Sequence, residues 1–227
     1  MSIILSIETS TKTCSIALHK NKELLSEYSL HIHNSHSAVI SQMIQNTLSN
    51  VSLTLKDVSA VAVSEGPGSY TGLRIGISTA KGLAYALDLP IIKISTLQAM
   101  AQEVSKYAGQ SLLFPMIDAR RMEVYTMQIH QGNIIKHPYP LILDSNTFDS
   151  IQEEIILFGN GSEKCKTLYP HKTNISIIDN ITPTAKNVGE LAIKKIEEHK
   201  FEDIQLLEPF YLKEFYTPKA KNPLKRT

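Results

Sequence analysis

The chain has 227 residues, of which 42% are hydrophobic and 20% charged, and its 23 Lys and Arg oppose 22 Asp and Glu, a composition that excludes disordered, collagen-like and strongly charged proteins. A chain of this length buries a core without disulfides, and two cysteines are too few for a disulfide framework. Since the sequence shows neither a signal peptide nor an apolar run of membrane-spanning length, we expect a soluble cytoplasmic protein.

The first part of the chain passes from strands to alternating helices and strands. The predicted elements, in chain order, are strands over residues 3–8, 14–19 and 24–30, a helix over 37–49, a strand over 58–63, a helix over 69–87 and a strand over 91–94. Short polar turns join the first three strands, which predicts an antiparallel meander. The later alternation favours a mixed sheet with helices on its faces.

The second part of the chain repeats this opening. Ser95 and Gln98 have the spacing of a capping box for a helix to about Tyr107, and Thr182 and Pro183 have the character of N-cap and first residue of a helix to about His199. Between them we predict strands over residues 112–118, 124–129, 134–136 and 155–158. Two lobes that each begin with paired strands indicate an α/β protein with the actin-like or hexokinase-like (ASKHA) fold. We expect a first lobe over residues 1–105 and a smaller lobe over 106–182.

The segment from Ser64 to Gly82 combines a strand end, a Gly-Pro-Gly turn and the start of a helix. Gly66 and Gly68 have access to backbone angles closed to other residues, and a helix that begins at Ser69 directs free N–H groups over the loop. Either a phosphate or carboxylate binds there, or the segment is a tight turn without a ligand. The sequence leaves both interpretations open.

Two helices carry more small and apolar residues than one buried face requires. In the helix over 69–87 an apolar stripe faces the sheet, and a second stripe of small residues lets another helix approach closely, at a cost of about 1 kcal/mol for each glycine. The helix over 37–49 has a similarly wide apolar arc. We interpret the excess as a partner-binding surface, and an overpacked core is the alternative. The residues assigned to that surface are Ile40, Met43, Ile44, Thr47, Gly72, Gly76, Thr79 and Lys81.

Four motifs together resemble one protein family. They are IETSTKTCSIAL from Ile7, SEGPGSYTGLRIG from Ser64, DARRMEVY from Asp118 and EPFYL from Glu208. Over nearly its whole length the chain is similar to the bacterial TsaB (YeaZ) family, the companion subunit in making threonylcarbamoyladenosine at position 37 of tRNA. The resemblance implies a two-lobe actin-like fold in which residues 183–227 return to the first lobe.

The same resemblance implies partners. They are a second copy of the chain when it is alone, the catalytic paralogue TsaD through the two helices above, the ATPase subunit TsaE of the same complex, and tRNA indirectly through that complex. Neither a membrane nor a cofactor is expected.

This copy lacks side chains that the catalytic paralogue carries, so we expect a scaffold without catalytic residues. Thr96 and Met100 stand where the paralogue has two metal-binding histidines, and Lys12 replaces an acidic residue in the first turn. Asp118 stands in a second turn that is Gly-Gly in the paralogue. Positions left over from a nucleotide site are Glu8, Thr9, Ser10, Gly66, Gly68, Asp118, Gly159 and Gly161.

Other chemistry-bearing residues favour ordinary structural roles. His31, His33 and His36 form a cluster without a neighbouring carboxylate or cysteine, so surface histidines are favoured over a metal site. Cys14 and Cys165 have no base beside them in sequence and are interpreted as buried, unreactive thiols.

Two other functions remain as alternatives, and one segment has an open role. The chain could act alone as an actin-like ATPase or kinase, or as a peptidase on its partner, although it lacks the motifs GxSxG and HExxH. The basic C-terminal segment with Lys219, Lys221, Lys225 and Arg226 is either a solvated end or an arm near tRNA or the ATPase.

Overall fold

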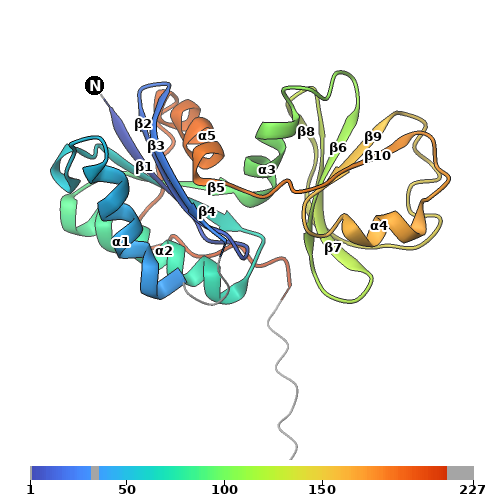
Figure 1. Cartoon of the computed structure of the whole chain (residues 1–227), viewed down its shortest axis with the longest axis horizontal. Coiled ribbons are helices and arrows are strands. Elements are labelled where there is room, and N and C mark those ends of the chain that lie inside the picture. Colours follow the sequence, from blue (N-terminus) through green and yellow to red (C-terminus); the bar gives the residue numbers. More distant parts are fainter. Residues whose placement is uncertain (1, 32–35, 214–227) are drawn as a thin grey trace, which may run out of the picture.

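The computed structural model describes residues 2–31 and 36–213, and these form two lobes side by side (Figure 1). The first lobe contains the strands β1 (Ile3–Glu8), β2 (Cys14–Lys20), β3 (Glu23–Leu30), β4 (Ala60–Gly66) and β5 (Ile91–Ser95). The second contains β6 (Leu112–Asp118), β7 (Glu123–His130), β8 (Asn133–Ile142), β9 (Ile155–Phe158) and β10 (Ile175–Ile178). The helices are α1 (His36–Ser49), the 3-10 helix η1 (Leu55–Asp57), α2 (Tyr70–Leu87), α3 (Thr96–Val104), α4 (Glu163–Leu168) and α5 (Ala185–Glu197).

The two sheets share one topology. The strand order is β3-β2-β1-β4-β5 in the first sheet and β10-β9-β6-β7-β8 in the second, which is the same order read from the opposite edge. In each sheet the first three strands form an antiparallel meander and the last two add in parallel. The predicted meander, mixed sheet and repeated opening are therefore confirmed.

Helices cover both faces of the first sheet. Because successive side chains of a strand point to opposite faces, Leu5 and Ile7 pack with α1 and α2, whereas Ile4 packs with α3 and α5. Helix α3 also contributes Leu97 and Met100 to the core of the second lobe, so it contacts both sheets. The boundary predicted after residue 105 stays a prediction. In the described part of the chain, each helix is too short or too polar to cross a membrane.

The end of the chain lies against the first lobe. Helix α5 packs on β1 and β2 (Figure 1). The backbone N–H of Ala185 there donates to Ser15 Oγ over 2.7 Å. Residues 201–213 continue along the same lobe, and Phe210 N–H donates to the carbonyl oxygen of Glu65 over 2.7 Å. Lys213 Nζ then lies 2.5 Å from Glu123 Oε1 at the start of β7. This C-terminal segment thus joins the two lobes.

Several predicted helix ends are wrong. Ser95 precedes α3 but its side chain makes no capping bond, because the residue still belongs to β5 and its Oγ is buried. Helix α5 begins two residues later than predicted, since the side chain of Thr184, not Thr182, accepts from Asn187 N–H. Helix α3 ends at Val104, and the sequence prediction omitted β10, a four-residue edge strand. Short elements such as β10 carry too few residues for a clear period.

Candidate functional site

The turn between β1 and β2 lies against the start of α2. Ser69 N–H donates to the carbonyl oxygen of Ser10 over 2.7 Å, and Thr9 Oγ1 donates to the carbonyl oxygen of Gly72 over 2.8 Å. A Cβ at Gly68 would overlap Ser10, and a Cβ at Gly72 or Gly76 would overlap Thr9. These glycines therefore serve the close approach of the β1–β2 turn, so the prediction that a helix approaches Gly72 and Gly76 is wrong.

Most residues assigned to the partner-binding surface are buried within the monomer. Ile40, Met43, Ile44 and Thr47 on α1 are at most 5% exposed, and Gly72 and Gly76 on α2 are also buried. The prediction that these six residues contact a partner directly is therefore wrong, because they are already covered within the first lobe. Thr79 and Lys81 are partly exposed. The wide apolar arc of α1 belongs largely to the core, as the alternative interpretation held.

The solvent side of the two helices carries different residues. On α2 an exposed stripe at helical spacing contains Thr71, Arg74, Ser78, Gly82 and Tyr85. On α1 the exposed positions include Ala38, Ser41, Gln42 and Gln45. A Cβ at Gly82 would meet nothing within 4 Å, in contrast to Gly76. Sequence reasoning missed this stripe, although its spacing of three and four residues on the side opposite Leu73 and Ile77 was a usable signal.

The Gly-Pro-Gly turn is packed from both sides. A Cβ at Gly66 would lie 2.6 Å from the carbonyl oxygen of Phe210, and Gly66 has a φ of 122°. At the start of α2, Gly72 N–H donates to the Ser69 hydroxyl over 3.3 Å. The surroundings favour a tight turn over an anion site, because chain segments occupy the space over the glycines.

Glu8 ends β1 inside the protein. Its Oε1 accepts from Ser10 N–H over 2.5 Å, while Oε2 has no partner in the described chain. Burial raises the pKa of Glu8, and hydrogen bonds from Ser10 oppose that rise. The carboxyl group is therefore a buried structural group beneath the turn.

The second lobe has an equivalent hairpin turn between β6 and β7. Asp118 Oδ1 accepts from Arg120 N–H over 2.7 Å and lies 2.5 Å from Lys164 Nζ. Arg120 and Arg121 follow with φ values of 67° and 49°, in the left-handed region. The carboxylate is therefore balanced by a lysine, and both arginine side chains are exposed.

The glycine loop after β9 is closed by other parts of the chain. A Cβ at Gly159 would overlap Met100 Cε and the carbonyl oxygen of Met116, and one at Gly161 would lie 2.9 Å from Val124 Cγ1. Met100 and Thr96 are themselves at most 1% exposed. Met100 thus fills the space beside the loop.

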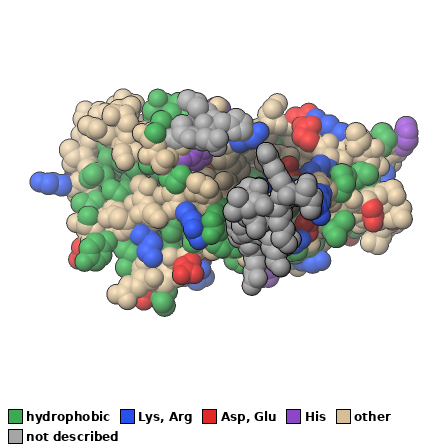
Figure 2. Space-filling model, turned by 90° about the horizontal axis from the view of Figure 1, so that it is seen from below, with side chains coloured by type: hydrophobic (Ala, Val, Ile, Leu, Met, Phe, Trp, Pro, Cys, Tyr) green, Lys and Arg blue, Asp and Glu red, His purple; other side chains and the backbone are tan. Residues whose placement is uncertain are grey.

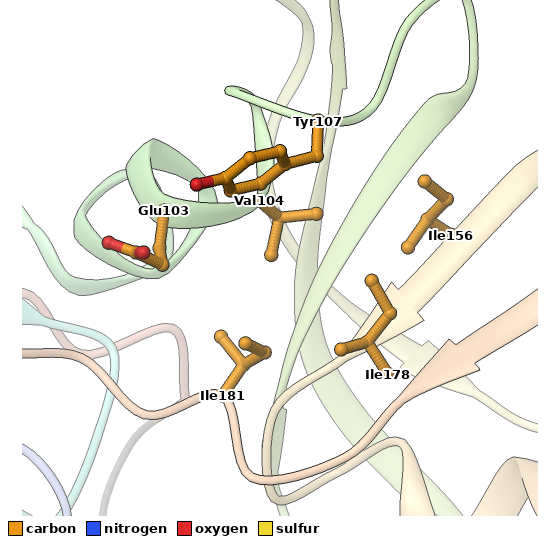
Figure 3. Close-up of a pocket in the computed structure, with 6 residues that line it drawn as sticks. All are labelled: Glu103, Val104, Tyr107, Ile156, Ile178 and Ile181. Carbon is orange, nitrogen blue, oxygen red and sulfur yellow. The ribbon is translucent and has the colours of Figure 1, made fainter.

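An apolar hollow lies where α3, the second sheet and the linker to α5 meet (Figure 3). Val104, Ile156, Ile178 and Ile181 point toward it, and Glu103 lies at its edge (Figure 3). Such a lining offers no cation to a phosphate group.

Two of the clustered histidines contact the β1–β2 turn. His36 Nε2 lies 2.9 Å from the carbonyl oxygen of Thr11, and His31 Nδ1 lies 3.1 Å from Thr13 Oγ1. His36 is 7% exposed, so its prediction as a surface histidine is wrong: the turn covers it. His33 lies outside the described residues. Over residues 2–31 and 36–213 no three His, Cys, Asp or Glu side chains are arranged to hold a metal ion.

Both cysteines are buried thiols, as predicted. Cys14 is 2% exposed and Cys165 is fully buried. Burial, with a smaller effect of Glu8, raises the pKa of Cys14 to about 11, and burial raises that of Cys165 to about 12. Neither forms a thiolate at neutral pH.

Comparison with known proteins decides the family. The TsaD family profile, described as tRNA N6-adenosine threonylcarbamoyltransferase, matches residues 23–217. The tRNA threonylcarbamoyladenosine biosynthesis protein TsaB of Escherichia coli is 31% identical over 220 residues, which cover 92% of this chain and 94% of that protein. The chain belongs to the TsaB (YeaZ) family. TsaB of Bacillus subtilis is 39% identical over 123 residues, so the chain spans about half of that relative, 53% of its length.

Solved structures agree with this membership. YeaZ from Pseudomonas aeruginosa superposes with a TM-score of 0.81 and 27% identity, covering 93% of this chain and all of that chain. Component A of the (R)-2-hydroxyglutaryl-CoA dehydratase from Acidaminococcus fermentans reaches a TM-score of 0.55 at 9% identity, which shows the fold alone. The two-lobe actin-like fold predicted from the TsaB resemblance is therefore confirmed.

Proposed function

We propose that this chain is the non-catalytic scaffold subunit in the synthesis of threonylcarbamoyladenosine at position 37 of tRNA, with the catalytic paralogue TsaD as its partner. Its relatives are named for that biosynthesis, and the TsaD profile covers most of the chain. The proposal includes as further partners a second copy of the chain, the ATPase subunit TsaE and, indirectly through the complex, tRNA. It places the chain in the cytoplasm.

The filled glycine loop supports the non-catalytic role most directly. Met100 occupies the space beside Gly159, and a thioether is a much weaker ligand for a divalent metal ion than the neutral imidazole that the paralogue has at this position. Lys12 is exposed at the tip of the first turn, where an acidic residue would be needed to hold a metal-bound nucleotide. A chain with these replacements contributes surface, not reactive groups.

The partner face in this proposal is the solvent side of α1 and α2. Both helices lie on one face of the first sheet, away from the second lobe (Figure 1). Gly82 lies on this side in open space, so a second helix can approach α2 closely there. The later part of that stripe, Ser78, Gly82 and Tyr85, replaces the buried residues as the expected contact.

Gly82→Arg tests the face. The added side chain has room in the monomer, so the variant folds, but it protrudes where the partner helix would lie. We expect the variant to lose co-purification with TsaD while its melting temperature stays at or above that of the wild type. Thr167→Arg is the matched control, because it adds the same side chain at an exposed position of α4 on the second lobe.

A Gly82→Arg variant that holds TsaD as firmly as wild type would overturn the proposed face. Restored modification of tRNA in cells by that variant would point the same way. Gly76 is unsuited to this test, because a larger side chain there collides with Thr9 and disturbs the fold itself.

A further inference from the structure

Arginine is rare in this chain and unevenly placed. The sequence has four arginines among 23 basic residues. Arg74 lies in the first turns of α2, and Arg120 and Arg121 lie in the β6–β7 turn. The fourth, Arg226, lies beyond the described residues. Lysines are spread over the whole sequence, so the arginines call for a separate explanation.

The C-terminal segment brings the described arginines to one side of the molecule. Arg74 Nε donates to Tyr211 Oη over 3.2 Å, and two residues later Lys213 Nζ reaches Glu123, next to the β6–β7 turn. Figure 2, the view from below, shows Lys and Arg side chains interspersed with Asp and Glu on both lobes. The start of α2 and the tip of the second hairpin thus share one surface.

Aromatic rings accompany the arginine on the first lobe. The rings of Tyr70 and Tyr211 lie 5.0 Å apart at an angle of 30°, and Arg74 Cζ lies 4.1 Å above the Tyr70 ring. Tyr211 is 37% exposed. A guanidinium group stacked on an aromatic ring keeps its N–H groups available at the edge of the plane for phosphate oxygens.

The residues in the β6–β7 turn are not the ones that its backbone conformation favours. Two consecutive residues with positive φ favour Asn and Gly, whereas this chain has Arg120 and Arg121 there. The nearby carboxylates are already paired, Asp118 with Lys164 and Glu123 with Lys213. In the described chain neither arginine forms an ion pair. Residues with a strained backbone whose side chains form no internal ion pair point to an external partner.

We propose that Arg74, Arg120 and Arg121, with the rings of Tyr70 and Tyr211, form an arginine edge that binds the phosphates and a stacked base of RNA. The planar, bidentate guanidinium suits phosphate, and tyrosine rings stack on unpaired bases. Arginine and tyrosine are also enriched in protein interfaces, so a protein contact at this edge is an outcome that the test below distinguishes. This inference rests on the proposed function and extends it, because that function identifies the RNA as the tRNA substrate.

Arg120→Asn with Arg121→Gly tests the edge, because it removes two charges and restores residues that the turn prefers. Binding of a fluorescein-labelled tRNA transcript with adenosine 37 is followed by anisotropy over a range of salt concentrations. We expect affinity to fall about tenfold or more at low salt, and the salt slope to fall by about 1.5. The same variant should melt at a higher temperature than wild type.

Two further variants complete the test. Arg74→Ala should also weaken binding, since it removes the stacked guanidinium. Lys56→Ala is the control. Lys56 is exposed in η1, which precedes the start of β4, whereas the Gly-Pro-Gly turn follows the other end of that strand. Its loss should leave the affinity for tRNA unchanged. Binding is measured for the isolated chain and for its complex with TsaD. A variant that fails to form this complex can then be told apart from a variant that fails to bind tRNA.

Unchanged tRNA affinity and salt slope in the double variant would overturn the arginine edge. If the double variant instead loses TsaD while it binds tRNA like wild type, the edge is a protein contact and the inference is equally wrong.

Discussion

His19 shows how a single residue ties the sheet to the last helix. It lies near the end of β2 beneath α5, is 1% exposed, and neither ring nitrogen has a partner in the described chain. A Cβ at Gly189 would overlap its Nδ1, so glycine is required where α5 crosses the ring. Burial lowers the pKa of His19, Glu190 opposes that shift and Lys186 adds to it. The neutral ring is therefore part of the packing of α5.

Acid should weaken the fold through His19. Its pKa is about 6.5 in the unfolded chain and lower in the folded one, so the unfolded state binds more protons between these two values. The free energy of unfolding should fall as the pH drops below about 6.5 and level off below the folded pKa. Urea denaturation at several pH values, compared between wild type and His19→Gln, isolates this contribution.

In that experiment the informative quantity is the difference between the two curves of unfolding free energy against pH. Glu8 changes the stability with pH in the opposite direction to His19. Its raised pKa means that its contribution to stability is lost as the pH rises above about 4.5. Because Glu8 is present in both proteins, its effect cancels. Parallel curves for wild type and His19→Gln between pH 7 and 5 would contradict the role assigned to the buried ring.

At the scale of one element, α2 separates two kinds of glycine. The N-cap at Ser69 and the last residue Leu87 match the predicted helix ends, because the cap residue and the apolar stripe are local signals. Gly76 and Gly82 look equivalent in sequence. In the structure one abuts Thr9 and the other faces open space.

Alanine at these two positions should therefore have opposite effects. Gly82→Ala should raise the free energy of unfolding by about 1 kcal/mol, the usual gain over glycine within a helix. Gly76→Ala should lower it by about 1–3 kcal/mol, because its Cβ displaces Thr9 and strains the bond from Thr9 to Gly72. Thermal or urea denaturation of both variants measures the contrast. Stabilisation by both would show that the β1–β2 turn yields easily.

At the scale of the whole molecule, the chain crosses between lobes and returns. Helix α5 contacts β1, β2, β4 and β5, and Val188 and Ala192 are fully buried against that sheet. The first lobe is thus built from both ends of the sequence, and α3 lies between the sheets (Figure 1). The second lobe is continuous in sequence.

Removal of residues 183–227 should open the first lobe alone. Without α5, Ile4, Ser15 and His19 lose their cover, so the amides of β1 and β2 should lose protection from hydrogen exchange. Strands β6 and β9 should keep theirs, because α5 does not form part of their core. A chain that ends at Lys213 is the control. If β1 and β2 kept their wild-type protection in the chain that lacks residues 183–227, the role of α5 in the first lobe would be contradicted.

The sequence by itself determined the order and type of the long elements, the repeated sheet opening and the family. Hydrophobic periods of two and 3.6 residues and local turn residues are written within each segment. Only the tertiary structure decided which small and apolar residues face the core. Thr9 meets Gly72 across 63 residues, and His36 meets Thr11 across 25. Burial depends on such distant neighbours, which the period of one helix does not contain, so the predicted partner face moved from the buried side of α1 and α2 to their solvent side.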